Sequence, residues 1–121
     1  MAITVIKTNQ NLASSTIVKD TNANGTAADN TTSTTGTLYS IEVSNPNTDW
    51  VYFKLADTTD ATAGTTDATL IYPAAAVTTS SIVFPQGIAF ANGFSHWCVT
   101  AATGSSTTNL SSAVTVTYVT V

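Results

Sequence analysis

The chain has 121 residues, a formal net charge of −4 and only 8% charged side chains, against about 25% in a typical globular protein. Its cations are three scattered lysines, Lys7, Lys19 and Lys54, and it has no arginine. This excludes nucleic acid and an anionic membrane as partners of a basic patch, because both need clustered cations.

The first third of the chain, residues 1–35, is expected to form an N-terminal arm plus a long loop within a single domain over residues 1–121. Residues 2–7 and 14–20 have the pattern of short strands. Residues 21–35 contain an Asn-Gly pair and almost no large apolar side chain, which is typical of a loop. We expect this loop to lie over a neighbouring subunit or at a tip of the molecule.

Residues 38–56 have the clearest pattern and predict a β-hairpin with one buried and one solvated face. The apolar side chains that recur on one face are Leu38, Ile41, Val43, Val51, Phe53 and Leu55. Glu42, Tyr52 and Lys54 alternate with them and are expected to face water. The turn contains Pro46, which fixes φ, and Asn and Asp residues, whose side chains bond to nearby backbone.

The rest of the chain is expected to add short strands between polar loops. Strands are expected at residues 70–72, 77–84, 88–90, 94–100 and 110–121. The loops and turns between them are expected at residues 57–69, 85–87, 91–93 and 103–109. The apolar phase slips at Tyr118-Val119, where a bulge or a swap of faces would fit. About eight strands without an amphipathic helix predict an all-β antiparallel fold, a β-sandwich or a barrel.

The N-terminal sequence lacks the long apolar segment of a signal peptide, and no apolar run approaches the ~18 residues that cross a bilayer. A single cysteine, Cys98, excludes an internal disulfide. We therefore expect synthesis in a cytoplasm and no membrane partner.

Residue patterns for catalysis and metal binding are weak. His96 and Cys98 lie two apart on a predicted strand, where a packed histidine and a buried thiol are expected instead of a metal site. Asp57, Asp60 and Asp67 lack the spacing of a calcium loop and indicate a solvated acidic loop. No nucleophile elbow or phosphate-binding glycine loop occurs. We expect no enzyme activity, no cofactor, no metal and no catalytic residue.

Four aromatic residues are the candidate binding residues. Trp50, Tyr52, Tyr72 and Trp97 could form a platform on which a sugar stacks. Alternatively, they fill the core or a subunit interface, where tryptophan and tyrosine are enriched. The scarcity of large apolar residues favours the core or interface.

Two segments resemble a group of small virion proteins of tailed bacteriophages, including cyanophages. They are residues 41–57, IEVSNPNTDWVYFKLAD, and residues 80–104, SSIVFPQGIAFANGFSHWCVTAATG. The matching positions are Val43, Asn45, Asn47, residues 51–55 and 84–88, Phe90, Asn92 and Gly93. Ala56 departs from the pattern, which has an aromatic residue there.

The resemblance implies a jelly-roll-like β-sandwich on a phage particle. It implies a capsid cement or decoration protein that binds the major capsid protein shell from outside and stabilises it. The protein would be a homo-oligomer, expected to be a trimer, on the capsid surface of the virion after synthesis in the host cytoplasm. The alternative is a glycan- or host-surface-binding module of a phage head or tail fibre.

Overall fold

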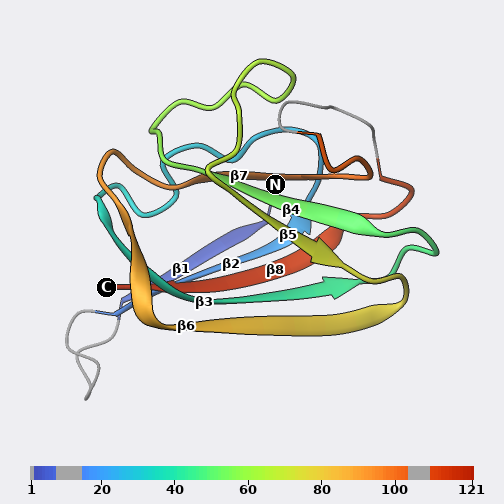
Figure 1. Cartoon of the computed structure of the whole chain (residues 1–121), viewed down its shortest axis with the longest axis horizontal. Helices are drawn as coiled ribbons and strands as arrows, with labels where there is room; N and C mark the ends of the chain where they lie inside the picture. Colours follow the sequence, from blue (N-terminus) through green and yellow to red (C-terminus); the bar gives the residue numbers. More distant parts are fainter. Residues whose placement is uncertain (1, 8–14, 104–109) are drawn as a thin grey trace.

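The computed structural model describes residues 2–7, 15–103 and 110–121, which form strands and no helix. The eight strands are β1 (Ile3–Lys7), β2 (Thr16–Ala23), β3 (Gly36–Asn45), β4 (Val51–Ala56), β5 (Leu70–Ala74), β6 (Thr78–Phe90), β7 (Ser95–Val99) and β8 (Val114–Thr120). They make two antiparallel sheets packed face to face, with strand orders β1-β2-β8-β3-β6 and β5-β4-β7 (Figure 1). The predicted all-β antiparallel sandwich is confirmed.

The path of the chain between the two sheets is that of a jelly roll. The chain changes sheet between β3 and β4, between β5 and β6, and at each later connection. Residues 24–31 run beside β7, where a fourth strand of the smaller sheet would lie. They form one bridge there, Ala28 to His96, and the Asn24 carbonyl accepts the Cys98 N–H at 2.8 Å. Most of the segment predicted as a loop therefore covers the edge of a strand of its own chain.

The predicted hairpin at residues 38–56 is wrong. Its first half is β3 in the five-stranded sheet and its second half is β4 in the three-stranded sheet, so the two strands face each other across the core. The turn is held by Asn45, whose Nδ2 donates to the carbonyl oxygens of Asp49, Ala74 and Ala75 at 3.0–3.2 Å. Alternation identified the buried face of each strand, but it carries no information on which sheet a strand joins.

The core between the sheets contains the apolar face of every strand from β2 to β8. Its buried members are Val18, Ala23, Leu38, Ile41, Val43, Val51, Phe53, Leu55, Ala74, Phe90, Phe94, Cys98, Val114, Val116 and Tyr118. A second, smaller cluster lies on the other face of the three-stranded sheet, around Trp97 and Val99. Residues 57–69, drawn in green at the top of Figure 1, fold back over that face. All five residues of β7 are buried because the strand lies between the two clusters.

The predictions for β6 and for the alternation of β8 differ from the structure. The strands expected at residues 77–84 and 88–90 are one strand, β6, which bulges where residues 84–87 stand opposite Tyr39 of β3. β8 alternates without a slip, and Tyr118 faces the core. The irregularity opposite Tyr118-Val119 is on β3, between Leu38 and Ser40. Most of the loop expected at residues 103–109, from 104 onward, and residue 14 of the second predicted strand lie outside the described residues.

Candidate functional site

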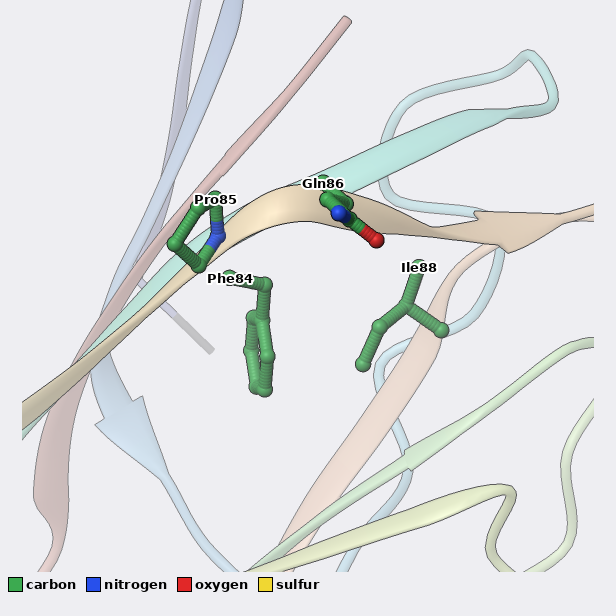
Figure 2. A pocket seen from close by; sticks show the side chains of 5 residues that line it. Phe84, Pro85, Gln86 and Ile88 are labelled. Atoms are coloured by element: carbon green, nitrogen blue, oxygen red, sulfur yellow. The ribbon is translucent and has the colours of Figure 1, made fainter.

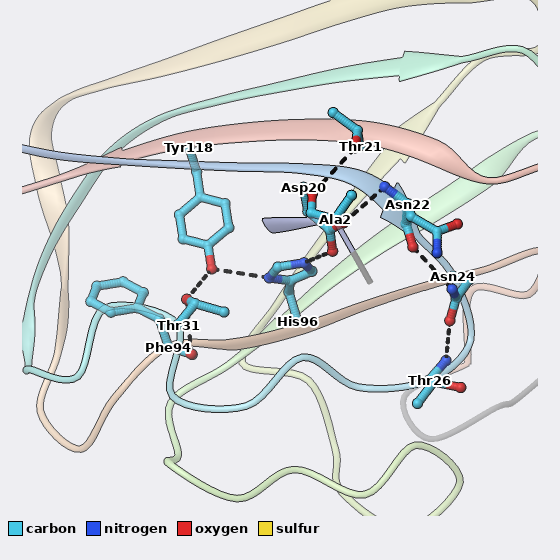
Figure 3. Close-up of polar contacts among 10 residues, drawn as sticks. All are labelled: Ala2, Asp20, Thr21, Asn22, Asn24, Thr26, Thr31, Phe94, His96 and Tyr118. Carbon is cyan, nitrogen blue, oxygen red and sulfur yellow. Dashed lines mark hydrogen bonds and ion pairs between the residues drawn. The ribbon is translucent and has the colours of Figure 1, made fainter. Parts of the chain in front are cut away.

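A chain of polar side chains crosses the core and is the main concentration of polar chemistry in the described residues (Figure 3). His96 Nε2 lies 2.8 Å from Asp20 Oδ2, and His96 Nδ1 lies 3.0 Å from the Tyr118 hydroxyl. That hydroxyl lies 2.5 Å from Thr31 Oγ1, which donates to the Phe94 carbonyl oxygen at 3.2 Å. Asp20, His96 and Tyr118 are all buried, and Thr31 is half-buried.

The number of hydrogens in this chain indicates its protonation. The four contacts need four hydrogens. A neutral imidazole facing an ionised Asp20 supplies only three, one each from His96, Tyr118 and Thr31. One further proton, shared by Asp20 and His96, satisfies every contact. With that proton on the ring the contact is an ion pair, and with it on Asp20 the contact is a hydrogen bond between neutral groups.

The order acid, imidazole, hydroxyl would suit proton transfer, but a catalytic group must touch its substrate. Tyr118 has no exposed surface. Burial raises the pKa of the Tyr118 phenol, an effect that the Thr31 hydrogen bond opposes and the nearby Asp20 charge reinforces, so the group stays a neutral hydroxyl. The chain joins β2, β7, β8 and residues 24–35, and its geometry holds the two sheets together.

Sequence reasoning identified only one member of this network. His96 and Cys98 are both buried, as expected, and burial raises the pKa of the Cys98 thiol, with a smaller contribution from Asp20. Asp20 was missed, although it shares the core-facing phase of β2 with Thr16 and Val18. The sequence signal for Asp20 was an acidic residue on the side of a predicted strand that otherwise faces the core. A buried charge needs a partner, so such a residue indicates a buried polar contact.

The three aspartates considered for calcium have different surroundings. Asp57 Oδ1 and Oδ2 accept the backbone N–H groups of Ala91, Asn92 and Gly93 at 2.7–3.2 Å and fix that turn. Partial burial opposes ionisation, but these bonds outweigh it and hold the pKa of Asp57 below its usual value. Asp60 and Asp67 are exposed. Within the described residues, no three His, Cys, Asp or Glu side chains gather as metal ligands.

The four candidate aromatic residues do not form a platform. Trp97 is 0% exposed beneath residues 57–69, so it cannot stack on a sugar. Tyr72 pairs with Phe53 and shares its core-facing side, whereas Tyr52 pairs with Pro73 on the opposite face of the sheet. Trp50 alone is well exposed, at 52%. The sequence pattern did not indicate that residues 57–69 cover one face of the sheet, or that the four aromatic side chains lie apart.

Lys54, which was expected to face water, is buried as well. Lys54 lies on the outer face of β4, and its Nζ donates to the Thr103 carbonyl oxygen. Burial lowers the pKa of the Lys54 amine, an effect that the Asp67 charge partly offsets. The side of β4 that was predicted to face water is therefore packed against other residues as well.

Two shallow hollows lie on the surface. One, of about 390 Å³, separates residues 25–29 from residues 60–63 and has Asp29 and Asp60 among its lining residues. The other, of about 340 Å³, lies at the β6 bulge. Figure 2 shows Phe84 and Ile88 pointing to the same side of the strand, with Gln86 between them.

Comparisons with known proteins add no relative: no protein-family model, no curated protein and no solved structure matches the chain. Among the described residues, no helix has the length and apolar character needed to cross a membrane.

Proposed function

We propose that this chain is a structural virion protein of a tailed bacteriophage. It acts as a capsid cement or decoration protein that binds the outside of the major capsid protein shell and stabilises it. It is made in the host cytoplasm and reaches the capsid surface as a homo-oligomer. The phage-like segments at residues 41–57 and 80–104 support this proposal, as does the jelly-roll connectivity, which many viral capsid domains share.

The observation that carries the proposal is the outer face of the five-stranded sheet. One row of paired residues crosses all five strands on this face: Thr4, Lys19, Thr117, Glu42 and Ser81. Its two charges have opposite signs, and the neighbouring row has Thr115, Ser44 and Thr79. The described residues leave this face open, whereas residues 57–69 cover the outer face of the other sheet.

This face suits docking on another protein. Thr and Ser side chains lose little rotamer entropy on burial and form hydrogen bonds at a wet interface. Because the face carries few charges, little charge desolvation opposes binding. Many copies on one shell add weak contacts into a large total stabilisation, which is what resistance to shear between capsid subunits requires.

The test is co-sedimentation of the purified protein with capsids assembled without it. Thr117→Arg, in the middle of the open face, is expected to reduce bound protein at least ten-fold. Thr65→Arg, an exposed threonine on the 57–69 loop, is the matched control and is expected to bind normally. Particles lacking the protein are expected to lose heat and osmotic tolerance. Equal binding by both variants, or unchanged tolerance without the protein, would contradict the proposal.

The competing function is a glycan- or host-surface-binding module of a head or tail fibre. The exposed Trp50 indole favours it, since it is the one candidate aromatic residue open enough to stack on a sugar. A glycan array would decide between the two functions. Saturable binding to one sugar class that Trp50→Ala abolishes would support the fibre role, and absence of binding would support the cement role.

A further inference from the structure

Strand β6 forms an unprotected edge of the five-stranded sheet. It is 13 residues long and pairs with β3 on one side, and no other described strand lies on its free side (Figure 1). Edge strands are normally protected by charged residues, proline, bulges or short length. Residues 78–83 are TTSSIV and have none of these protections. Pro85 and the bulge begin only after them.

The composition removes the usual electrostatic obstacle to self-association. All three lysines and all seven acidic residues lie within residues 1–67, so β6 carries no formal charge. Two β6 edges can therefore approach without like-charge repulsion. The opposite edge of the sheet is different, because β1 has only five residues and ends at Lys7.

The edge also contains a polar group without a partner. Ser80 Oγ is buried and has no hydrogen-bond partner among the described residues. A buried hydroxyl left unpaired destabilises a protein by about 1–3 kcal/mol. Val77 and Val83, at either end of this segment, are 68% and 67% exposed, more than the other exposed large apolar residues of the described chain. The unpaired hydroxyl and the two exposed valines both indicate that residues 77–83 contact another protein surface.

Symmetry then restricts how a second copy can pair. Two identical edges that pair antiparallel are related by a two-fold axis perpendicular to the sheet, and this rotation keeps each face on its own side. Directly opposed residues must therefore point to the same face, so the axis passes through a residue and not between two residues. The two central choices in residues 78–83 are Ser80 and Ser81.

An axis at Ser80 satisfies the unpaired group, whereas an axis at Ser81 does not. With the axis at Ser80, each Ser80 faces Ser80 of the second copy at a Cβ separation of about 4.5–5.5 Å, and rotation about χ1 turns the two hydroxyls out of their buried position toward each other. Thr79 then faces Ser81, and Val83 lies beside Val77. With the axis at Ser81, Ser80 would face Ile82 and stay unpaired.

We propose that this protein forms a two-fold dimer by antiparallel pairing of β6 with β6 of a second copy, centred on Ser80. The pairing joins two five-stranded sheets into one continuous sheet of ten strands. It closes at two copies because the contact is isologous and the bulge at residues 84–87 turns the strand away beyond it. The expected oligomer is therefore a dimer, in place of the trimer that the phage resemblance implies.

The first experiment measures the mass of the wild-type protein by sedimentation over about a hundred-fold dilution series, without capsids. The expected result is a reversible dimer of the 12.5 kDa chain, with a dissociation constant on the order of micromolar because strand pairing alone is a small interface. Ser81→Lys places two like charges near the axis and is expected to raise this constant at least ten-fold. Val5→Lys, on the β1 edge, is the matched control and is expected to leave it unchanged.

The second experiment tests the register by cross-linking. Ser80→Cys is expected to give a covalent dimer on mild oxidation or with a short bis-thiol reagent, whereas Val5→Cys is not. The wild type supplies the background, because its one cysteine, Cys98, is buried. Circular dichroism and the melting temperature confirm that each variant folds, and Val83→Glu replaces Ser81→Lys if that variant does not.

A monomer or a trimer at all concentrations would overturn the proposal. Equal weakening by Ser81→Lys and Val5→Lys would also overturn it, and so would equal cross-linking of Ser80→Cys and Val5→Cys. Because these measurements use the protein alone, their outcome is independent of whether the protein binds a capsid.

Discussion

Replacing Asp20 by asparagine tests whether the buried polar chain holds the two sheets together. The substitution keeps the shape of the side chain and removes its charge. In the native protein Asp20 Oδ2 accepts the His96 Nε2–H at 2.8 Å, while Oδ1 accepts the Asn22 N–H at 2.9 Å. An amide has one acceptor oxygen and one NH₂ group. In Asp20→Asn the amide oxygen can keep the Asn22 N–H, but its NH₂ group can donate to His96 Nε2 only if that nitrogen carries no hydrogen, so the ion pair is lost.

The expected loss of stability follows from the burial of this pair. Asp20 and His96 have 0% and 1% exposed surface, so water cannot replace the missing contact. Removing one partner of a buried ion pair typically destabilises a protein by about 3–5 kcal/mol. For a domain of this size, that corresponds to a fall in melting temperature of about 10–25 °C.

Urea or thermal unfolding followed by circular dichroism measures this loss. Asp49→Asn makes the same charge change at an exposed carboxylate and is expected to lie within about 0.5 kcal/mol of the wild type. A loss below about 1 kcal/mol for Asp20→Asn, or a loss equal to that of Asp49→Asn, would refute the role of the pair.

Three further substitutions test other parts of the fold. Tyr118→Phe keeps the ring but removes the hydroxyl between His96 and Thr31, so unfolding experiments should find a loss of about 1–3 kcal/mol that is not additive with that of Asp20→Asn. Asp57→Asn should cost about 1 kcal/mol at pH 7. Because the folded pKa of Asp57 is lowered, its contribution is present above the unfolded value of 3.8 and is lost as the pH falls through the folded pKa, so the two proteins should converge in acid. Gly87→Ala places a Cβ 2.3 Å from Thr37 Cγ2 at a φ of +72°, and a loss smaller than about 1 kcal/mol would show that the bulge adapts.

The alternation of apolar residues was sufficient to predict the strands and their buried faces. It placed β2, β4, β5, β7 and β8 within a few residues of their observed bounds, because side-chain period two follows from the strand itself. The packed states of His96 and Cys98 were also predicted, from their common side of one strand and from the usual burial of a free cysteine. These features depend on neighbours along the chain.

The pairing of strands could not be read from the same pattern. Residues 38–56 look like a hairpin because two amphipathic strands flank a short turn, but Asn45 ties that turn to β5 and directs β4 into the other sheet. Lys54 was expected to face water but is buried, whereas the burial of Trp97 agrees with the core alternative and removes it from a sugar platform. A polar loop carries no local signal of what it will cover.

The amino-acid sequence by itself therefore determined that this protein is a small β-sandwich with little charge, because composition and alternation act residue by residue. Only the tertiary structure brought Asp20, His96, Tyr118 and Thr31 together from four separate segments and left Ser80 unpaired at an open edge. Those features come from contacts between residues far apart in the chain, which no local pattern encodes.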